Sequence, residues 1–343
     1  MTSTARRRWS RELEIEIDGI AFGTDGPVLV HGYDPPAGGM WVDSVIPGKL
    51  GALDRHTGET LWLSPCEVGY GRGFAAGFGS SGEAIVLGPS EQGHRMVRME
   101  RESGKLLGVE AIGEFDEALV FEDLCLCASA RSVFAITTPL MSEAWTYRPT
   151  KERIHHMARC GDRVLVGYSD PEKGCHGVMA LDALTGEPAA SLVPCRLPGI
   201  HGFAGSGEEA VILTADLQAA LPPELVGSFM IALGELEENG EVVADTLSLL
   251  GLAAGASEDE AGSWFEILST APGAAVGDVS ITANSGKLYV VQGAMLEARD
   301  ILTGRALGDW AIPGLDEQVA WQVSSGAGLL AEERRVSVFE LPA

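Results

Sequence analysis

Positive charge is scarce in this chain of 343 residues, which has 24 lysines and arginines against 49 aspartates and glutamates and a formal net charge of −25. Binding to nucleic acid phosphates needs clustered Lys and Arg side chains, so the composition argues against a nucleic acid partner. The deficit is largest between Leu197 and Gly286, where there is no Lys or Arg but there are fourteen acidic residues. That stretch is either a solubility surface or the contact surface for a partner with a basic surface.

Long apolar runs are also missing. A membrane-spanning helix takes about 20 apolar residues, and the best candidate stretch, residues 248–256, is far shorter. A basic cluster at residues 6–8 is followed by glutamates, whereas an export signal would continue with an apolar segment. The six cysteines are scattered, and without an export signal they are expected to be reduced thiols. These features predict a cytoplasmic protein with no membrane partner.

Catalytic and nucleotide-binding motifs are absent from the sequence. It contains no P-loop, no Gly-x-Ser-x-Gly elbow, no His-Glu-x-x-His and no Asp-x-Asp-x-Asp calcium loop. The Gly-x-Gly-x-x-Gly pattern at residues 77–82 precedes an apolar strand and not a helix, so it predicts a turn. No carboxylate pair stands beside an assignable nucleophile. We therefore expect no catalytic residue and no cofactor.

Potential metal ligands occur in the middle of the chain but without the spacing of a zinc site. Imidazoles and thiolates suit zinc, yet no Cys-x-x-Cys or His-x-x-x-His pair is present. Placement in the core, or by chance, is the simpler interpretation, so we expect no metal. The residues concerned are His155, His156, Cys160, Cys175, His176, Cys195 and His201.

What the chain does contain is an internal repeat. The segment Ala-Leu-Asp-x-x-Thr-Gly at residues 52–58 recurs at 180–186, in changed form at 298–304, and weakly at 98–104. Each copy stands between two short apolar segments. Asp opens a turn by bonding to its own backbone and Gly takes the left-handed position, so each copy predicts a turn between two strands. Degenerate copies fit at 135–137, 232–234 and 338–340.

A second signal, Gly or Ser-Gly followed by an apolar run, precedes each of these turns. Examples are residues 26–30, 82–87, 161–166, 207–213 and 286–291. Each predicts a strand, a tight turn and another strand. Seven alternating copies of both signals give seven units of four strands with a mean spacing of 49 residues, close to the ~40–50 residues of a propeller blade.

The two ends of the chain complete this pattern. The last unit stops one strand short, and Trp9-Ser10-Arg11 resembles the strand that contains Trp62. We therefore predict an all-β, seven-bladed propeller of four-stranded blades, closed by an N-terminal strand that completes the last blade. Residues 1–343 are expected to form a single domain, with residues 1–8 as a disordered tail. Trp62, Trp145 and Trp310 are expected to pack between blades.

The Ala-Leu-Asp-x-x-Thr-Gly-x-x-x-Trp units resemble the repeat of the PQQ-like, or quinoprotein-like, β-propeller superfamily over essentially the whole chain. The resemblance implies the fold. Members that bind the quinone generally have eight blades, an export signal and a pair of adjacent cysteines, whereas the nearest pair here is Cys125 and Cys127. A non-enzymatic member is therefore expected.

Extra length identifies the expected binding face. Insertions are predicted at about residues 31–49, 214–227 and 251–277, in connections from strand two to strand three or from blade to blade. These connections leave a propeller on one face, and decorated faces of repeat folds commonly bind partners. The aromatic and imidazole residues expected there are Tyr33, Trp41, Tyr168, His176, Trp264 and Phe265.

Two kinds of function follow. The first is a non-catalytic scaffold or adaptor that binds a protein partner through the decorated face, as a monomer or as a subunit of a hetero-complex. In the second, the mouth of the central channel serves a quinoprotein-like oxidoreductase, a lyase or a small-molecule sensor. The same aromatic side chains could also pack down to order their own loops.

Overall fold

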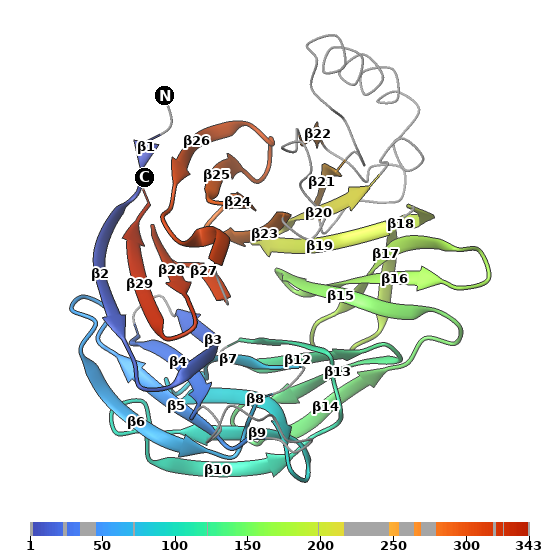
Figure 1. The fold of residues 1–343 in the computed structure, drawn as a ribbon. Helices are drawn as coiled ribbons and strands as arrows, with labels where there is room; N and C mark the ends of the chain where they lie inside the picture. Colours follow the sequence, from blue (N-terminus) through green and yellow to red (C-terminus); the bar gives the residue numbers. More distant parts are fainter. Residues whose placement is uncertain are drawn as a thin grey trace. The chain divides into compact units, whose positions relative to one another are not determined.

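The computed structural model describes residues 3–22, 26–34, 46–70, 73–121, 123–197, 199–215, 247–253, 264–268, 279–317, 320–324 and 326–341 (Figure 1). These residues divide into two compact units. The terminal unit comprises residues 4–146 and 313–343, and the middle unit comprises residues 1–3 and 147–312. The expectation of a single domain stays a prediction.

The terminal unit contains four antiparallel sheets, which we call blades 1, 2, 3 and 7. Blade 1 contains β3 (Glu16–Phe22), β4 (Val28–Tyr33), β5 (Gly48–Leu53) and β6 (Thr60–Cys66). Blade 2 contains β7 (Ala75–Phe78), β8 (Ala84–Ser90), β9 (Gly93–Met99) and β10 (Leu106–Ala111). Blade 3 contains β11 (Glu117–Val120), β12 (Leu124–Ser129), β13 (Ser132–Thr137) and β14 (Ser142–Tyr147). Blade 7 contains β27 (Ala320–Ser324), β28 (Ala327–Ala331), β29 (Arg335–Glu340) and β2 (Arg6–Glu12), and a short 3-10 helix, η3 (Leu315–Glu317), precedes it.

The middle unit contains the other three sheets of the described residues. Blade 4 contains β15 (Arg153–Cys160), β16 (Arg163–Asp170), β17 (Cys175–Asp182) and β18 (Pro188–Leu197). Blade 5 contains β19 (Gly199–Ser206), β20 (Glu209–Ala215), β21 (Leu247–Ala253) and β22 (Phe265–Ile267). Blade 6 contains β23 (Val279–Asn284), β24 (Lys287–Gln292), β25 (Met295–Asp300) and β26 (Ala306–Ala311), with β1 (Ser3–Thr4) paired to its outer edge. The predicted all-β propeller of seven four-stranded blades is confirmed.

Burial along the strands follows their position in a blade. The second strand β4 is buried at all its positions, whereas the outer strand β6 alternates between exposed and buried residues. A second strand is covered on both faces by neighbouring blades, so its side chains are mostly apolar, with His31 as the buried polar exception in β4, while an outer strand has one face in solvent. The core accordingly consists of separate apolar clusters between adjacent blades, one of which joins Val30 of blade 1 to Leu329 of blade 7.

The N-terminal segment is part of blade 7. Strand β2 pairs antiparallel with β29, with Arg6 opposite Glu340 and Trp9 opposite Val338 (Figure 1). The prediction that the N-terminal strand completes the last blade is therefore confirmed. The prediction of a disordered tail over residues 1–8 is wrong for the described residues from Ser3 onward, because β1 and β2 gain backbone partners at two blade edges.

The repeated aspartates form the predicted turns. The Oδ1 atom of Asp54 accepts hydrogen bonds from the backbone N–H groups of His56 at 2.9 Å and Thr57 at 2.7 Å, and Gly58 has a φ of +74°. The turns that begin at Asp182 and Asp300 repeat this bonding. Where the chain reverses, the backbone takes a left-handed conformation, which glycine adopts without strain because it has no Cβ. This requirement explains the glycine of the repeat.

Tryptophans join neighbouring blades at these same turns. The indole Nε1 of Trp9 donates to the carbonyl of Arg55, that of Trp62 to the carbonyl of Arg101, and that of Trp264 to the carbonyl of Ile301. Each ring also covers the turn glycine of the blade it reaches. A tryptophan buries a large apolar area and satisfies its N–H at the same time, so one residue type meets both needs. The predicted blade-packing role of Trp62 is correct.

Blade 5 departs from the predicted arrangement. Residues 232–234 were expected to end its third strand, but β20 pairs along its length with β21, residues 247–253. Leu247 and Leu249 of β21 pack in the apolar cluster between blades 5 and 6. No local motif indicates that β21 is the strand that pairs with β20. The connection between β20 and β21 therefore covers residues 216–246, longer than the predicted 214–227.

The expected restriction of extra length to one face is also wrong at blade 5. The predicted insertion at 31–49 overlaps β4 and β5 at its two ends, because only residues 34–47 lie between these strands. The third predicted insertion, at 251–277, is interrupted by β22, and its first part joins strand three to strand four. That connection leaves from the face opposite the decorated face, which we call the face of the tight turns because it carries the turns between strands three and four, such as the one at Asp54. Within the described ranges, no helix is long and apolar enough to cross a membrane.

Candidate binding groove

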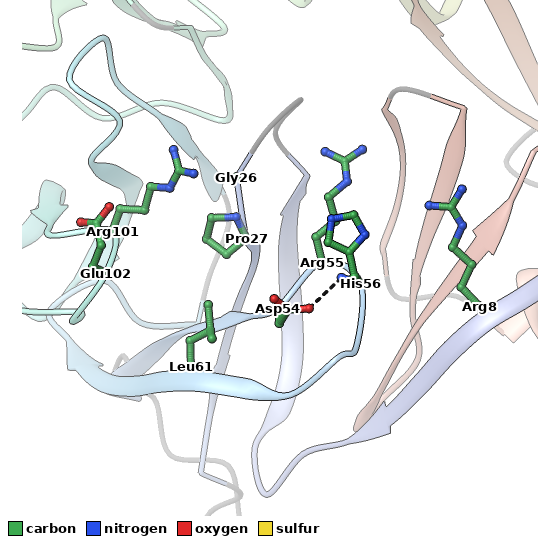
Figure 2. A pocket seen from close by; sticks show the side chains of 9 residues that line it. All are labelled: Arg8, Gly26, Pro27, Asp54, Arg55, His56, Leu61, Arg101 and Glu102. Atoms are coloured by element: carbon green, nitrogen blue, oxygen red, sulfur yellow. Dashed lines mark hydrogen bonds between the residues drawn. The ribbon is translucent and has the colours of Figure 1, made fainter.

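A cavity of about 590 Å³ opens on the face of the tight turns in the terminal unit. It lies where three structures meet: the turn between β5 and β6, the corresponding turn of blade 2, and strand β2 of blade 7. Figure 2 shows Arg101 on one side of the Gly26–Pro27 turn and Arg55 with Arg8 on the other. The lining residues are Arg8, Gly26, Pro27, Asp54, Arg55, His56, Leu61, Arg101 and Glu102. We call this cavity the arginine groove.

Two of the three arginines occupy the same position of the repeat. Arg55 follows the turn residue Asp54 in blade 1, and Arg101 follows Glu100 in blade 2. Their carbonyls are the acceptors of the tryptophan N–H bonds, at 2.8 Å from Trp9 and 2.7 Å from Trp62. The backbone that carries both guanidinium groups is therefore held by packing between blades. This preorganisation reduces the conformational entropy lost on binding.

The side chains of the arginine groove rest on aromatic rings and on one ion pair. The guanidinium carbon of Arg55 lies 4.5 Å from the centroid of the Phe22 ring, and that of Arg101 lies 6.0 Å from the centroid of Phe78. The Nε of Arg8 donates to Glu340 at 3.1 Å on the surface. Cation–π contacts of this kind orient a guanidinium group above the ring.

Of the two acidic residues in the arginine groove, Asp54 is part of a turn. The carboxylate of Asp54 accepts two backbone N–H bonds inside its turn, and these bonds lower its pKa below the usual 3.8. It is therefore charged but already bonded to the turn. With Glu102 as the second acid, three arginines and two acidic residues line the groove of a chain whose net charge is −25. The groove is thus a cationic site on an acidic protein, suited to carboxylates or other anions.

A second cavity, of about 370 Å³, is lined by the first strands of blades 1, 2, 3 and 7. Its floor includes Asp18, whose Oδ1 lies 2.5 Å from Nδ1 of the fully buried His31. The other ring nitrogen, Nε2, donates to the carbonyl of Val68 at 3.0 Å. A histidine acting as a general base would need that nitrogen free to face a nucleophile. The Asp18–His31 pair therefore joins neighbouring segments of the core.

The histidines of the middle unit come together at one end of blades 4 and 5. The rings of His155 and His176 lie 5.2 Å apart, and His155 Nε2 is 2.6 Å from the Ser169 hydroxyl. Burial lowers the pKa of His155, His156 and His176, and neighbouring positive or imidazole groups lower it further. Three or more ligands arranged to hold a metal ion are found nowhere among the residues that the structure describes.

The structure places the residues predicted for the decorated face in several different environments. Tyr33 ends β4 and is buried against Tyr70, with ring centroids 5.0 Å apart. Burial, with Glu16 nearby, raises the pKa of Tyr33 to about 12. Tyr168 and His176 lie on β16 and β17, partly exposed. Trp41 lies outside the described residues.

The expectation that Trp264 and Phe265 sit in a loop after blade 5 is wrong. Phe265 begins β22, the outer strand of that blade, and packs against the apolar cluster between blades 4 and 5. Trp264 covers Gly304 and donates to Ile301 in blade 6, so it is the counterpart of Trp9 and Trp62. That Trp264 and Phe265 contact a partner stays a prediction.

The arginine groove itself was not predicted from the sequence. A signal was present, because Arg follows the turn acid in two consecutive repeat units, whereas Ala183 and Ile301 hold that position in blades 4 and 6. The third arginine, Arg8, belongs to a basic cluster that the sequence relates only to export signals. Convergence of the three needed the pairing of β2 with β29.

These observations define the chain as a seven-bladed β-propeller whose turns and tryptophans recur from blade to blade. No protein-family model and no curated protein matches it. Among solved structures, 917 chains match, so the fold is widespread and does not by itself select an activity. One is BamB from Moraxella catarrhalis, at 12% identity and a TM-score of 0.52, with 98% of this chain and 97% of that chain covered. This likeness shows the fold alone.

Proposed function

We propose that this protein is a non-catalytic scaffold or adaptor that docks an acidic segment of a partner protein in the arginine groove. The observation that carries the proposal is the convergence of Arg8, Arg55 and Arg101 on one cavity of a chain with a net charge of −25. Arginine binds carboxylates with two parallel hydrogen bonds, and it is enriched where protein interfaces gain most of their energy.

The chemistry of the lining favours binding over catalysis. The nine lining residues include no hydroxyl or thiol nucleophile, and the carboxylate of Asp54 is occupied by its turn. The cationic groups number three, fewer than a nucleic acid site would need to overcome the repulsion from this acidic chain. A protein segment with a few carboxylates fits the available charge.

Other features of the proposal rest on the sequence. The acid-rich stretch 197–286 supports a second contact with a partner that has a basic surface, and most of its acids lie outside the described residues. The five cysteines described by the structure form no disulfide, which is typical of a reducing compartment and supports a cytoplasmic location.

The test compares capture of partners from the native host by the wild-type chain and by the Arg55→Gln/Arg101→Gln variant. The matched control is Arg131→Gln/Arg153→Gln, which removes the same charge at two exposed positions outside the groove. We expect a partner captured by the wild type and the control to be reduced about tenfold with the groove variant, equivalent to a loss of ~1.4 kcal/mol. Equal recovery with all three chains would refute the proposal.

The cavity between the first strands supports a second candidate, a small-molecule sensor or an enzyme that uses the channel mouth. Among the described residues, the buried indole N–H of its lining residue Trp321 has no hydrogen-bond partner. A buried donor without an acceptor is costly, and a ligand carbonyl or carboxylate could satisfy it. A ligand that raises the melting temperature of the wild type but not of Trp321→Phe would favour this candidate.

A further inference from the structure

A third cavity, of about 260 Å³, lies beside the arginine groove in the terminal unit. Its floor consists of Ile15, Val30 and Leu53, which are buried, while Leu13 and Leu63 are more exposed at its sides. The remaining lining residues are Arg11, Glu12, Glu14, Gly51 and Thr60. We call it the apolar cavity. An apolar floor with a polar rim is the usual anatomy of a protein contact site.

The same two strands, β2 and β6, contribute residues to both cavities. Strand β2 contributes Arg8 to the arginine groove and Arg11 to the apolar cavity, and β6 contributes Leu61 to the first and Leu63 to the second. Leu61 and Leu63 are two residues apart on β6, so their side chains point to the same face and lie roughly 6.6 Å apart. A single extended segment running along the crevice between β2 and β6 can therefore reach both cavities.

The charges of the two cavities differ in sign. Three arginines and two acids line the arginine groove, whereas one arginine, Arg11, and two acids, Glu12 and Glu14, line the apolar cavity. Acidic side chains of a ligand are thus favoured in the groove and disfavoured next to it. Apolar side chains find a buried apolar floor only in the second cavity.

We infer that the partner segment is an extended peptide with two parts, a short acidic run in the arginine groove and adjoining bulky aliphatic residues in the apolar cavity. This inference rests on the proposed docking function and specifies its ligand. The acidic run supplies attraction and orientation, because carboxylates pair with guanidinium groups. The aliphatic residues supply burial, which stabilises the complex because apolar surface is removed from water.

The test measures fluorescence anisotropy of three labelled synthetic peptides with the purified full chain. The first joins a run of glutamates to a run of leucines and valines, the second has the same composition with the two kinds of residue alternating, and the third contains the glutamate run alone. We expect the first peptide to bind about tenfold more tightly than the other two, a difference of ~1.4 kcal/mol.

One variant and its control test whether the apolar cavity causes that difference. Leu63→Ser should abolish the advantage of the first peptide and leave binding of the glutamate run unchanged. The matched control is Leu107→Ser on β10, because Leu107 is 51% exposed and Leu63 is 41% exposed, but Leu107 lines neither cavity. Since both positions are exposed on outer strands, both variants should keep the melting temperature of the wild type.

The outcomes separate the inference from the function on which it rests. If the wild type binds the three peptides equally, or if Leu63→Ser keeps the advantage of the first, the two-part ligand is refuted and anionic docking stands. If the Arg55→Gln/Arg101→Gln variant binds the glutamate run as tightly as the wild type does, or if the wild type binds no peptide, the proposed docking function fails as well.

Discussion

Trp62 of blade 1 donates its indole N–H to the carbonyl oxygen of Arg101 in blade 2, at 2.7 Å. The same indole ring lies against Gly104 at the end of that turn. One side chain thus fixes the contact between two blades and the backbone of a groove arginine. Because Trp9 holds Arg55 in the same way, the stability of the fold and the geometry of the arginine groove depend on the same interactions.

Replacing Trp62 separates its hydrogen bond from its packing. Trp62→Phe keeps an aromatic ring but leaves the Arg101 carbonyl without its donor, which should lower the free energy of unfolding by about 1 kcal/mol. Trp62→Ala also opens a cavity, so its cost should be ~3–5 kcal/mol. Urea unfolding followed by circular dichroism measures both. Equal midpoints for wild type and Trp62→Ala would contradict the blade-joining role.

Gly104 should not tolerate a side chain. Its φ is +65° and a Cβ would overlap the ring of Trp62, so Gly104→Ala combines backbone strain with displacement of the indole. Gly286 is the control, because its φ is +74° and a Cβ there would meet nothing within 4 Å. We expect Gly286→Ala to lower the free energy of unfolding by ~1–2 kcal/mol because of the left-handed backbone alone. Gly104→Ala should lower it by roughly 1–3 kcal/mol more. Similar losses of stability in the two variants would show that the ring contact is unimportant.

The repeated aspartates should make the fold sensitive to strong acid. Hydrogen bonds from the Thr303 hydroxyl and backbone N–H lower the pKa of Asp300 below 3.8, and turn bonds from Thr185 do the same for Asp182. A carboxyl group whose pKa is lower in the folded protein stabilises it above the unfolded-state pKa, and that stability is lost as the pH falls through the folded-state pKa. Asp300→Ala should lower the melting temperature at pH 7 and have less effect at pH 2. An equal effect at both values would exclude the charged turn.

The histidines of blades 4 and 5 should destabilise the protein in mild acid. Burial first, and the neighbouring His155 and His201 next, lower the pKa of His176 below 6.5, and the ring Nδ1 has no hydrogen-bond partner among the described residues. The unfolded state therefore binds more protons than the folded state below that pH, and the free energy of unfolding falls as the pH drops from 7 to 5. His176→Gln should reduce this slope in urea unfolding measured across the range. An unchanged slope would contradict the effect of burial.

The buried thiols should be inert in the native protein. Burial raises the pKa of Cys66 to about 11 and those of Cys125 and Cys160 to about 12, and it raises that of Cys127 as well. The thiolate is the reactive form, so these four groups should react with Ellman's reagent only at the rate of unfolding. Labelling with and without urea, followed by peptide mass analysis, identifies the reactive positions. Rapid native labelling of Cys125 would mean that its blade opens readily.

The sequence by itself determined the turns, the number of blades and the strand that completes the last one. Asp54, Thr57 and Gly58 specify their turn through bonds within six residues, so every sharp copy of the motif could be recognised without knowledge of the rest of the chain. Burial on both faces likewise leaves a local apolar run, as in β4.

Only the tertiary structure decided the position of the third strand of blade 5, the role of Trp264 and the existence of the arginine groove. The pairing of β20 with β21 crosses residues 216–246, and no short motif records a partner that far away. Arg8, Arg55 and Arg101 are likewise remote in sequence and become neighbours because β2 joins β29. Hydrogen bonds within a turn are encoded locally, whereas a binding surface depends on which distant segments the packing of the blades brings together.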